Sequence, residues 1–350
     1  MERRSMTMDE SRLDTRTDLT DADSSVRVGI DVGGTKTLCV AVGTDGRILA
    51  QVRRPTGRGG GQVVDGVVDI VAATLHEAGL APEHANVEGI GVGIPGTVDR
   101  ATGRVTQAVN LGADEIDLGA ALVSSYGVRV VVENDVNAAA MGAWGLNGCT
   151  PADAAFLNLG TGVAAGFIVD GQLVHGSSGV AGEIGHMVID PSGPMCGCGQ
   201  RGCAEAIISG PAVARAWPTE EPYPIVDLLE KAEDGDLDAM RVRDTFAMGI
   251  ARTVQLMTLA TDPAVVMIGG GVANAGQPLL DCVRKAIDGM EDVSPFLASL
   301  NMGRRLRLVD GSRPVGAIGA ALLVGLEQDA CDATAVTGTG FVGKEVSQPV

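Results

Sequence analysis

The chain has very few aromatic residues and no long apolar run. Aromatic side chains make up 3% of its 350 residues, so Val, Ala, Leu and Ile must build the core that a 45% share of apolar residues allows. No apolar run approaches the roughly 20 residues that a membrane span needs. The first residues also lack the apolar centre of a secretory signal. We therefore expect a cytoplasmic protein with no membrane partner.

Positive charge is scarce as well. The chain has 26 Lys and Arg against 44 Asp and Glu, which gives a formal net charge of -18. Nucleic-acid binding depends on a basic surface that neutralises phosphates, so the balance argues against a nucleic-acid partner. Glycine, by contrast, is abundant at 50 residues and follows no collagen-like period. That abundance indicates many tight turns and close backbone approaches.

Two series of strand-like segments share one pattern. Residues 26–54 contain three β-rich runs that predict an antiparallel meander, and residues 154–173 again read strand, Gly/Thr loop, strand and Asp-Gly turn. This repetition predicts a duplicated α/β fold with two lobes. The predicted parts are a disordered tail (1–25), an N-terminal lobe (26–133, closed by a helix at about 315–327), a C-terminal lobe (134–314) and a flexible tail (328–350).

A cysteine cluster stands out in the second lobe. Cys196, Cys198 and Cys203 form a C-x-C-x4-C group on a glycine-rich segment, and His186, one of four histidines, precedes it by ten residues. Three thiolates and one imidazole are a ligand set typical of tetrahedral zinc. The alternatives are three small buried thiols with a core histidine, or a disulfide, which an odd total of seven cysteines and an expected reducing compartment disfavour.

Three glycine-rich loops follow strand-like runs. In the first, Gly33 and Gly34 leave room for a phosphate at the backbone amides, Thr35 offers a hydroxyl, Lys36 a cation, and Asp31 a water-mediated magnesium ligand. Each loop alone is also compatible with a plain turn. Together they predict a nucleotide site, in which the third loop would seat an adenine ring. The second and third loops comprise Gly160, Thr161, Gly162, Gly269, Gly270 and Gly271.

The segment ENDVN (133–137) joins a buried strand to a helix. Phosphoryl transfer to an alcohol needs a base aimed at the hydroxyl, and Asp135 is the candidate. Asn134 would bond a substrate hydroxyl, both donating and accepting. The alternative is that Asn134 and Asp135 only cap the helix that follows.

The motifs DVGGTK, GIPGTVD, ENDVN, LGTG, GEIGH, CGCGQRGC and IGGGVA occur in this order. In this the chain resembles the ROK family of bacterial sugar kinases and repressors, over about residues 26 to 326. The resemblance implies the two-lobed actin-like, ribonuclease-H-like α/β sugar kinase fold, with a cleft between the lobes.

The resemblance also implies roles for particular residues. Asp135 would be the catalytic base, with Mg2+ accompanying ATP, and the zinc would be structural. A homodimer or homotetramer is the family expectation. The implied ligands of the sugar are Gly96, Asn110, Asn134, Asp135, Glu183, His186 and Glu205, of which His186 also binds zinc with the three cysteines.

The predicted function is an ATP-dependent hexose kinase acting on the 6-hydroxyl of glucose or a close relative. The sequence does not decide which hexose is the substrate, because Glu183 and Glu205 would also suit a cationic amino sugar. Kanosamine, glucosamine and N-acetylmannosamine are therefore alternatives, as is polyphosphate in place of ATP. A different-class alternative is a sugar sensor or repressor of the same family without its DNA-binding domain.

Overall fold

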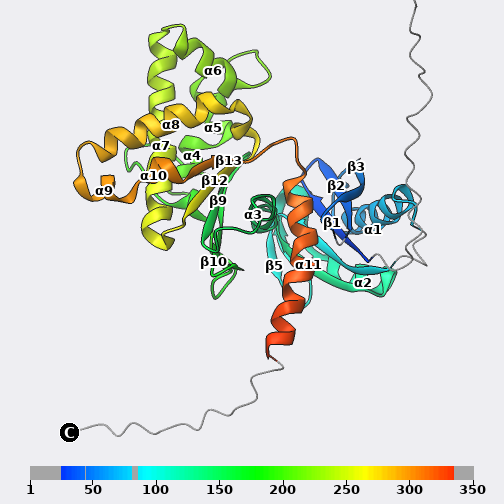
Figure 1. Cartoon of the computed structure of the whole chain (residues 1–350). Coiled ribbons are helices and arrows are strands. Elements are labelled where there is room, and N and C mark those ends of the chain that lie inside the picture. The colour runs from blue at the N-terminus through cyan, green and yellow to red at the C-terminus, as the bar shows by residue number, and fades with distance from the viewer. Residues whose placement is uncertain (1–24, 44, 81–85, 335–350) are drawn as a thin grey trace, which may run out of the picture.

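The chain folds around two five-stranded sheets that have the same strand order (Figure 1). The computed structural model describes residues 25–43, 45–80 and 86–334. Nearly all of the predicted N-terminal tail (1–25) and most of the predicted C-terminal tail (328–350) lie outside these residues. The same order of strands in both sheets confirms the predicted duplication and the two-lobed α/β fold. The predicted lobe boundaries at residues 134 and 315 stay a prediction.

The first sheet has the order β3-β2-β1-β4-β8. Its first three strands are antiparallel, as the meander prediction requires, and the last two pairs, β1 with β4 and β4 with β8, are parallel. The parallel strands are mostly buried because helices cover them. The strands are β1 (Val26–Val32), β2 (Lys36–Gly43), β3 (Ile48–Pro55), β4 (Val87–Ile94) and β8 (Arg129–Asn134).

The second sheet repeats this arrangement in the order β11-β10-β9-β12-β13. The β9–β10 and β10–β11 pairs are antiparallel, whereas β12 pairs in parallel with β9 and β13. A third, three-stranded sheet extends the first half in the order β5-β6-β7. The strands are β9 (Ala154–Leu159), β10 (Val163–Val169), β11 (Gln172–Leu173), β12 (Val265–Gly269), β13 (Leu306–Leu308), β5 (Thr97–Asp99), β6 (Arg104–Ala108) and β7 (Ala113–Asp117).

Helices surround both sheets, and short 3-10 turns interrupt the loops. The helices of the first half are α1 (Gly60–Glu77) and α2 (Leu118–Tyr126), with the turn η1 (Val109–Leu111). Those from residue 135 onward are α3 (Asp135–Leu146), α4 (Ala204–Ile208), α5 (Gly210–Ala216), α6 (Pro224–Glu233), α7 (Leu237–Thr261), α8 (Gln277–Glu291), α9 (Pro295–Leu300), α10 (Met302–Arg305) and α11 (Val315–Thr334), with turns η2 (Ile184–His186) and η3 (Gly271–Ala275).

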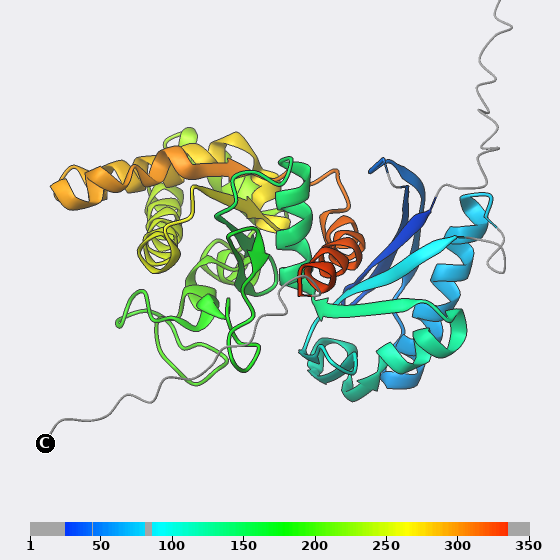
Figure 2. The same cartoon turned by 60° about the horizontal axis from the view of Figure 1, so that its bottom comes forward.

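Two helices, α3 and α11, lie side by side between the sheets (Figure 2). Glycine lets them approach closely: a Cβ at Gly319 would lie 1.7 Å from the carbonyl oxygen of Ala138, and one at Gly142 would lie 1.9 Å from that of Val315. Helix α11 also packs on β1 and β4. There, a Cβ at Gly91 would lie 1.8 Å from the Ala320 carbonyl oxygen, so this position of β4 admits only glycine.

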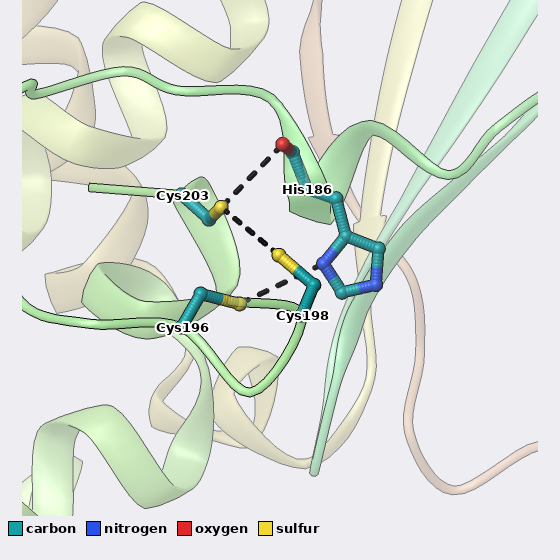
Figure 3. A group of neighbouring side chains, drawn as sticks. All are labelled: His186, Cys196, Cys198 and Cys203. Atoms are coloured by element: carbon teal, nitrogen blue, oxygen red, sulfur yellow. Dashed lines mark hydrogen bonds between the residues drawn. The ribbon is translucent and has the colours of Figure 1, made fainter. Parts of the chain in front are cut away.

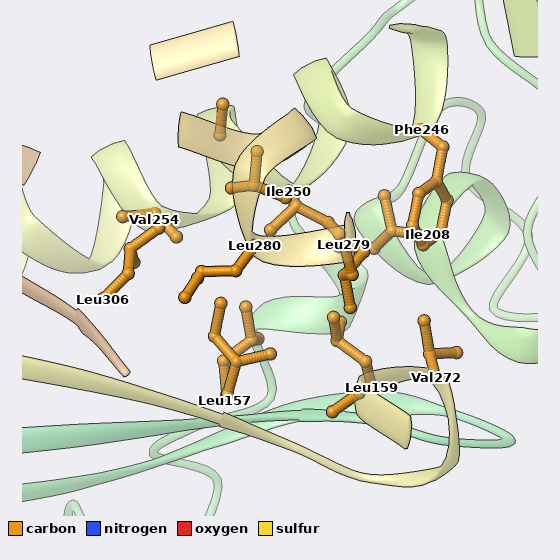
Figure 4. Packing of buried hydrophobic residues seen from close by; sticks show 14 of the residues in the cluster. Leu157, Leu159, Ile208, Phe246, Ile250, Val254, Val272, Leu279, Leu280 and Leu306 are labelled. Atoms are coloured by element: carbon orange, nitrogen blue, oxygen red, sulfur yellow. The ribbon is translucent and has the colours of Figure 1, made fainter. Parts of the chain in front are cut away.

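The larger core belongs to the second half of the chain (Figure 4). Leu157 of β9 faces Ile250 of α7 and Leu280 of α8, and all three are buried. The apolar residues on one face of α8 therefore hold it over the sheet. This packing keeps the strand ends of β9 and β12, which carry two of the glycine loops, on a rigid support.

Helix α11 extends further than the sequence predicts. It runs to Thr334, seven residues beyond the end expected for the closing helix at about residue 327. Residues 328–334 contain neither Gly nor Pro, and nothing in their backbone chemistry ends a helix. Among the described residues, none of the helices has the length and apolarity needed to cross a membrane.

Candidate functional site

The candidate site begins where the parallel strands of the first sheet end. Asp31 lies near the end of β1, and Asp135 follows β8 directly. Because β1, β4 and β8 are parallel, their carboxyl ends meet at one edge of the sheet, where α/β proteins commonly bind ligands. Gly93 of β4 lies between them, since a Cβ there would come within 3.5 Å of the Asp135 Cα.

The turn from β8 into α3 holds both predicted catalytic residues. Asn134 caps the helix, because its Oδ1 accepts hydrogen bonds from the backbone N–H groups of Val136 (2.9 Å) and Asn137 (3.3 Å). The Asn134 oxygen thus serves the helix, and its amide nitrogen is the group left for a sugar hydroxyl; the predicted contact of Asn134 with a substrate stays a prediction. Asp135 Oδ1 accepts from the Val136 N–H at 3.0 Å.

Three carboxylates converge here. Burial, and then the charge of Asp135, raise the pKa of Asp31 to about 6. Burial also raises the pKa of Asp135, with a further contribution from the charge of Glu183. Glu183 belongs to the second half of the chain, so the structure brings a residue of the GEIGH motif to the catalytic turn. Such a concentration of negative charge is suited to a bound cation or to a proton acceptor.

Replacing Asp31 with Asn is expected to stabilise the protein at neutral pH. Because the folded-state pKa lies above the ordinary value of 3.8, the folded chain binds more protons between about pH 4 and 6, and the free energy of unfolding falls as pH rises through that window. Above pH 6, the ionised Asp31 carboxylate lowers the free energy of unfolding by about 3 kcal/mol. Urea unfolding without added magnesium or nucleotide, from pH 5 to 8, should show Asp31→Asn gaining about 2 to 3 kcal/mol at pH 8. An equal or lower stability at pH 8 would contradict this.

The first glycine loop lies beside the predicted sugar residue Asn110. The Gly33 N–H donates to the Lys36 carbonyl oxygen at 2.9 Å, which closes the loop, and a Cβ at Gly34 would lie 3.5 Å from the Asn110 Cβ. Thr35 and Lys36 are exposed at its tip, where they are accessible to a ligand.

The second glycine loop is joined to Glu205. The Glu205 Oε2 accepts the backbone N–H of Val163 at 3.1 Å and lies 2.8 Å from the position of a Cβ on Gly162. A side chain at Gly162 would therefore displace Glu205. The Gly160 carbonyl oxygen also accepts the N–H of Gly210, at the start of α5, at 2.9 Å. These contacts connect a predicted phosphate loop to a predicted sugar ligand.

The second and third glycine loops meet in one cavity. Its volume is about 370 Å3, and Gly160, Thr161 and Gly271 contribute to its wall together with Tyr223 and Pro224. Gly270 adopts φ 87° and lies against Leu159, where a Cβ would be 2.5 Å from the carbonyl oxygen. The cavity residues Tyr223 and Pro224 have no distinctive motif around them, and sequence reasoning missed them.

Gly96 follows Ile94 by two residues, and Ile94 pairs with Asn134 of β8. Gly96 has φ 119°, and a Cβ there would lie 2.7 Å from the Thr106 carbonyl oxygen, so the β5–β6 hairpin requires glycine at this position for packing. Its predicted contact with a sugar stays a prediction.

The predicted metal ligands come together (Figure 3). The ligand atoms of His186, Cys196, Cys198 and Cys203 all lie within 4.8 Å of one another. Cys198 Sγ and Cys203 Sγ are 3.6 Å apart, far from a disulfide bond length, and His186 Nδ1 is 3.7 Å from Cys196 Sγ. Tetrahedral zinc with bonds of about 2.3 Å separates its sulfur ligands by about 3.8 Å. The four side chains thus form a candidate metal site.

Sequence reasoning missed the partners of Glu133. This residue is buried at 2% exposure, and its Oε2 lies 2.7 Å from His175 Nε2 and 3.3 Å from Arg100 Nε. Burial alone raises the pKa of Glu133, but the hydrogen bonds from His175 and Asn137 outweigh it and hold the pKa below its ordinary value. The available signal was a charged residue inside a buried strand, which requires partners.

Comparison with known proteins identifies relatives over most of the chain. A model of the ROK family matches residues 27–325. The glucokinase of Thermotoga maritima is 33% identical over 278 residues, which are 74% of this chain and 86% of the relative. The N-acetylmannosamine kinase of Yersinia pestis is 33% identical over 251 residues, 71% of this chain and 83% of the relative.

Solved structures are similar as well. A ROK hexokinase from Thermus thermophilus superposes with a TM-score of 0.71 at 30% identity, covering 87% of this chain and 99% of that one. A glucokinase from Streptomyces griseus in complex with glucose and AMPPNP has a TM-score of 0.65 at 30% identity, covering 85% of this chain and 98% of that one. A ROK family transcriptional regulator gives 0.73 at 22% identity, which shows a common fold alone.

Proposed function

The chain belongs to the ROK family, and from that premise we propose that it is an ATP-dependent hexose kinase acting on the 6-hydroxyl of glucose or a close relative. The observation that carries the proposal is the placement of Asp135. It stands at the first residue of α3, its pKa is raised by burial, and Asp31 and Glu183 lie near enough to act on it electrostatically.

In this proposal Asp135 accepts the proton of the 6-hydroxyl as the phosphoryl group is transferred. A carboxylate with a raised pKa is a better proton acceptor at neutral pH than an ordinary one. The Val136 N–H fixes the orientation of Asp135 by a hydrogen bond to Oδ1. Asp31 would hold magnesium through water, and the ion supplies positive charge that offsets the phosphates.

The nucleotide is proposed to bind across the glycine loops. The backbone amides of Gly34 and Gly162 would meet the phosphates, with Thr35, Lys36 and Thr161 as side-chain donors. The Gly33 N–H closes the first loop on the Lys36 carbonyl oxygen, and Gly33 would contribute by leaving room for the phosphate. The adenine ring would enter the cavity of about 370 Å3 between Gly271 and Tyr223, which offers both bare backbone and an aromatic face. Gly269 and Gly270 would support the wall of that cavity.

The sugar is proposed to lie between Asp135 and the second half of the chain. Asn134 would donate from its amide nitrogen, and Glu183 and Glu205 would accept from hydroxyl groups. His186 has two nitrogens, and Nδ1 faces the cysteines while the ring's other nitrogen points away from them (Figure 3). That nitrogen would be the one to meet the sugar. Gly96 and Asn110 would complete the pocket.

We propose zinc as the ion of the cysteine cluster, with a structural role. Three sulfur atoms and one imidazole nitrogen fit its preference, and these four ligands leave no position for a reacting group. Cys203 immediately precedes α4, which carries Glu205, and His186 lies three residues after Glu183. The ion would thereby fix the segments that bear both sugar-facing carboxylates.

The experiment that tests the function is an ADP-release assay with ATP and magnesium against a panel of hexoses. We expect turnover on glucose, because the relatives named glucokinase are up to 33% identical. N-acetylmannosamine is the second candidate substrate, since kinases of that sugar are equally similar. Glucosamine and kanosamine complete the panel, with polyphosphate as an alternative donor. Sugar binding without turnover on any substrate would overturn the kinase and favour a sensor.

A further inference from the structure

A buried carboxylate next to the catalytic turn has a full set of partners and no part in the chemistry proposed above. Glu133 Oε1 accepts from the backbone N–H of Asn134 (2.9 Å) and from Asn137 Nδ2 (3.0 Å). Its Oε2 faces His175 Nε2 (2.7 Å) and Arg100 Nε (3.3 Å). One oxygen thus contacts the first turn of α3, while the other contacts two side chains from elsewhere in the chain.

The two partners of Oε2 come from opposite halves of the molecule. Arg100 follows β5 in the small sheet of the first half, whereas His175 follows β11 in the second. A single carboxylate oxygen therefore joins the two halves. Because burying a charge without partners is costly, Glu133 favours the arrangement in which both side chains are in place.

His175 also begins the segment that leads to a proposed sugar ligand. The loop of residues 174–183 has His175 at Glu133 as its second residue and ends with Glu183, whose charge acts on Asp135. Both of its ends therefore lie at the segment 133–135. Gly176, Gly179 and Gly182 have φ between 72° and 100°, and the loop forms no helix or strand. Its C-terminal end is held on β10, where the Gly182 carbonyl oxygen accepts the Ala165 N–H at 2.8 Å, and His175 holds its beginning.

We propose that His175 is a positioning residue, supported by Arg100, that sets the loop 174–183 of one half against the catalytic turn of the other. The inference rests on the proposed kinase function. His175 holds the Glu133 carboxylate, Glu133 holds Asn134 and Asn137, and these residues set the direction of Asp135. The same contact fixes the beginning of the loop that ends at Glu183. Removal of His175 loosens both sides of the proposed sugar site without removing any group that touches the reactants.

The test compares His175→Ala with His175→Gln, whose amide nitrogen occupies about the position of Nε2. We expect His175→Ala to lower kcat by about 10- to 100-fold, because misplacement of reacting groups by about 1 Å costs up to this much. The KM for ATP should stay within about threefold of wild type, since the adenine cavity lies elsewhere. His175→Gln should recover kcat to within about fivefold of wild type. His76→Ala, at an exposed histidine of α1, is the matched control and should have no effect.

A second variant distinguishes positioning from simple loss of stability. Arg100→Ala removes the other partner of the same oxygen, and the double variant should lose less kcat than the product of the two single losses, since both act through Glu133. Unchanged kcat in His175→Ala would overturn the proposal. So would a His175→Gln variant as impaired as His175→Ala, which would make the imidazole itself a reacting or sugar-binding group.

Hydrogen exchange gives a readout that does not depend on turnover. In the full-length wild type, the amides of residues 176–183 and of the first turn of α3 should exchange more slowly than in His175→Ala, while those of α7 exchange equally in both. Equal exchange of the loop in both proteins overturns the positioning role. If the wild type turns over no sugar, the proposed kinase function is wrong. The hydrogen-exchange result then still tests whether the His175–Glu133 contact orders the loop.

Discussion

Asp135→Asn is expected to lower kcat for sugar phosphorylation by about 10^2- to 10^4-fold, the usual contribution of a positioned general base. The change keeps the shape of the side chain and removes only its ability to take a proton. Asp135 stands at the start of α3, where Asn134 provides the helix cap, so the helix itself does not depend on Asp135. The loss should therefore appear in the chemical step. The measurement is the ADP-release assay at saturating sugar and ATP.

Binding measurements separate this result from a damaged site. Calorimetric titration with the sugar should give a Kd for Asp135→Asn within about tenfold of wild type, because the remaining proposed sugar ligands are intact. Asp65→Asn, at an exposed position of α1, is the matched control and should retain full activity. Retention of more than a tenth of wild-type kcat by Asp135→Asn would contradict the assignment of the base.

Removal of the metal is the second large effect that we expect. The segment between η2 and α4 forms no helix or regular strand. Two isolated β-bridges, Val188 with Cys203 and Met195 with Arg201, and several backbone hydrogen bonds hold it, and an ion would add a constraint that ties His186 to the three cysteines. Without an ion, three thiol groups remain crowded within 4.8 Å of one another and of His186. Stripping the metal should lower activity by about 100-fold through displacement of Glu183 and Glu205, and should lower Tm.

Elemental analysis and re-addition complete this test. We expect one zinc per chain in the purified protein, and zinc, but not magnesium, should restore activity and Tm after chelation. Cys203→Ser should behave as the stripped protein, whereas Cys149→Ser, at an exposed cysteine outside the cluster, should behave as wild type. Full activity in a protein shown to contain no zinc would rule out the structural role.

The fold could be predicted to the extent that its signals are local. The β-rich runs and the Asp-Gly turns located the antiparallel strands, and the repeated pattern indicated the duplication. Helix α8 was missed although its buried residues Leu279, Leu280, Val283 and Ile287 follow a helical spacing after Pro278. The strands β5, β6 and β7 were missed for a different reason, since segments of three to five mixed residues resemble loops.

In the candidate site too, features with a local sequence signal could be predicted and features that depend on tertiary contacts could not. The cysteine cluster and the ENDVN turn were predictable because their members lie close together in the sequence. The contact between Glu205 and Val163 spans 42 residues, as does that between His175 and Glu133, and neither leaves a local trace. Tyr223 likewise reaches its cavity only through the packing of α5 and α6. Tertiary structure, which no short motif encodes, supplies these contacts.

The position of α11 at the end of the chain governs how the protein is assembled as it is synthesised. The glycine-lined face of β1 and β4 has α11 as its cover, yet β1 ends at Val32 and α11 begins only at Val315. At roughly 5 to 20 residues per second, the ribosome takes roughly 15 to 60 s to supply that cover. The strands of the second sheet are all made within this interval, so the half of the protein that is translated first is the half that is completed last.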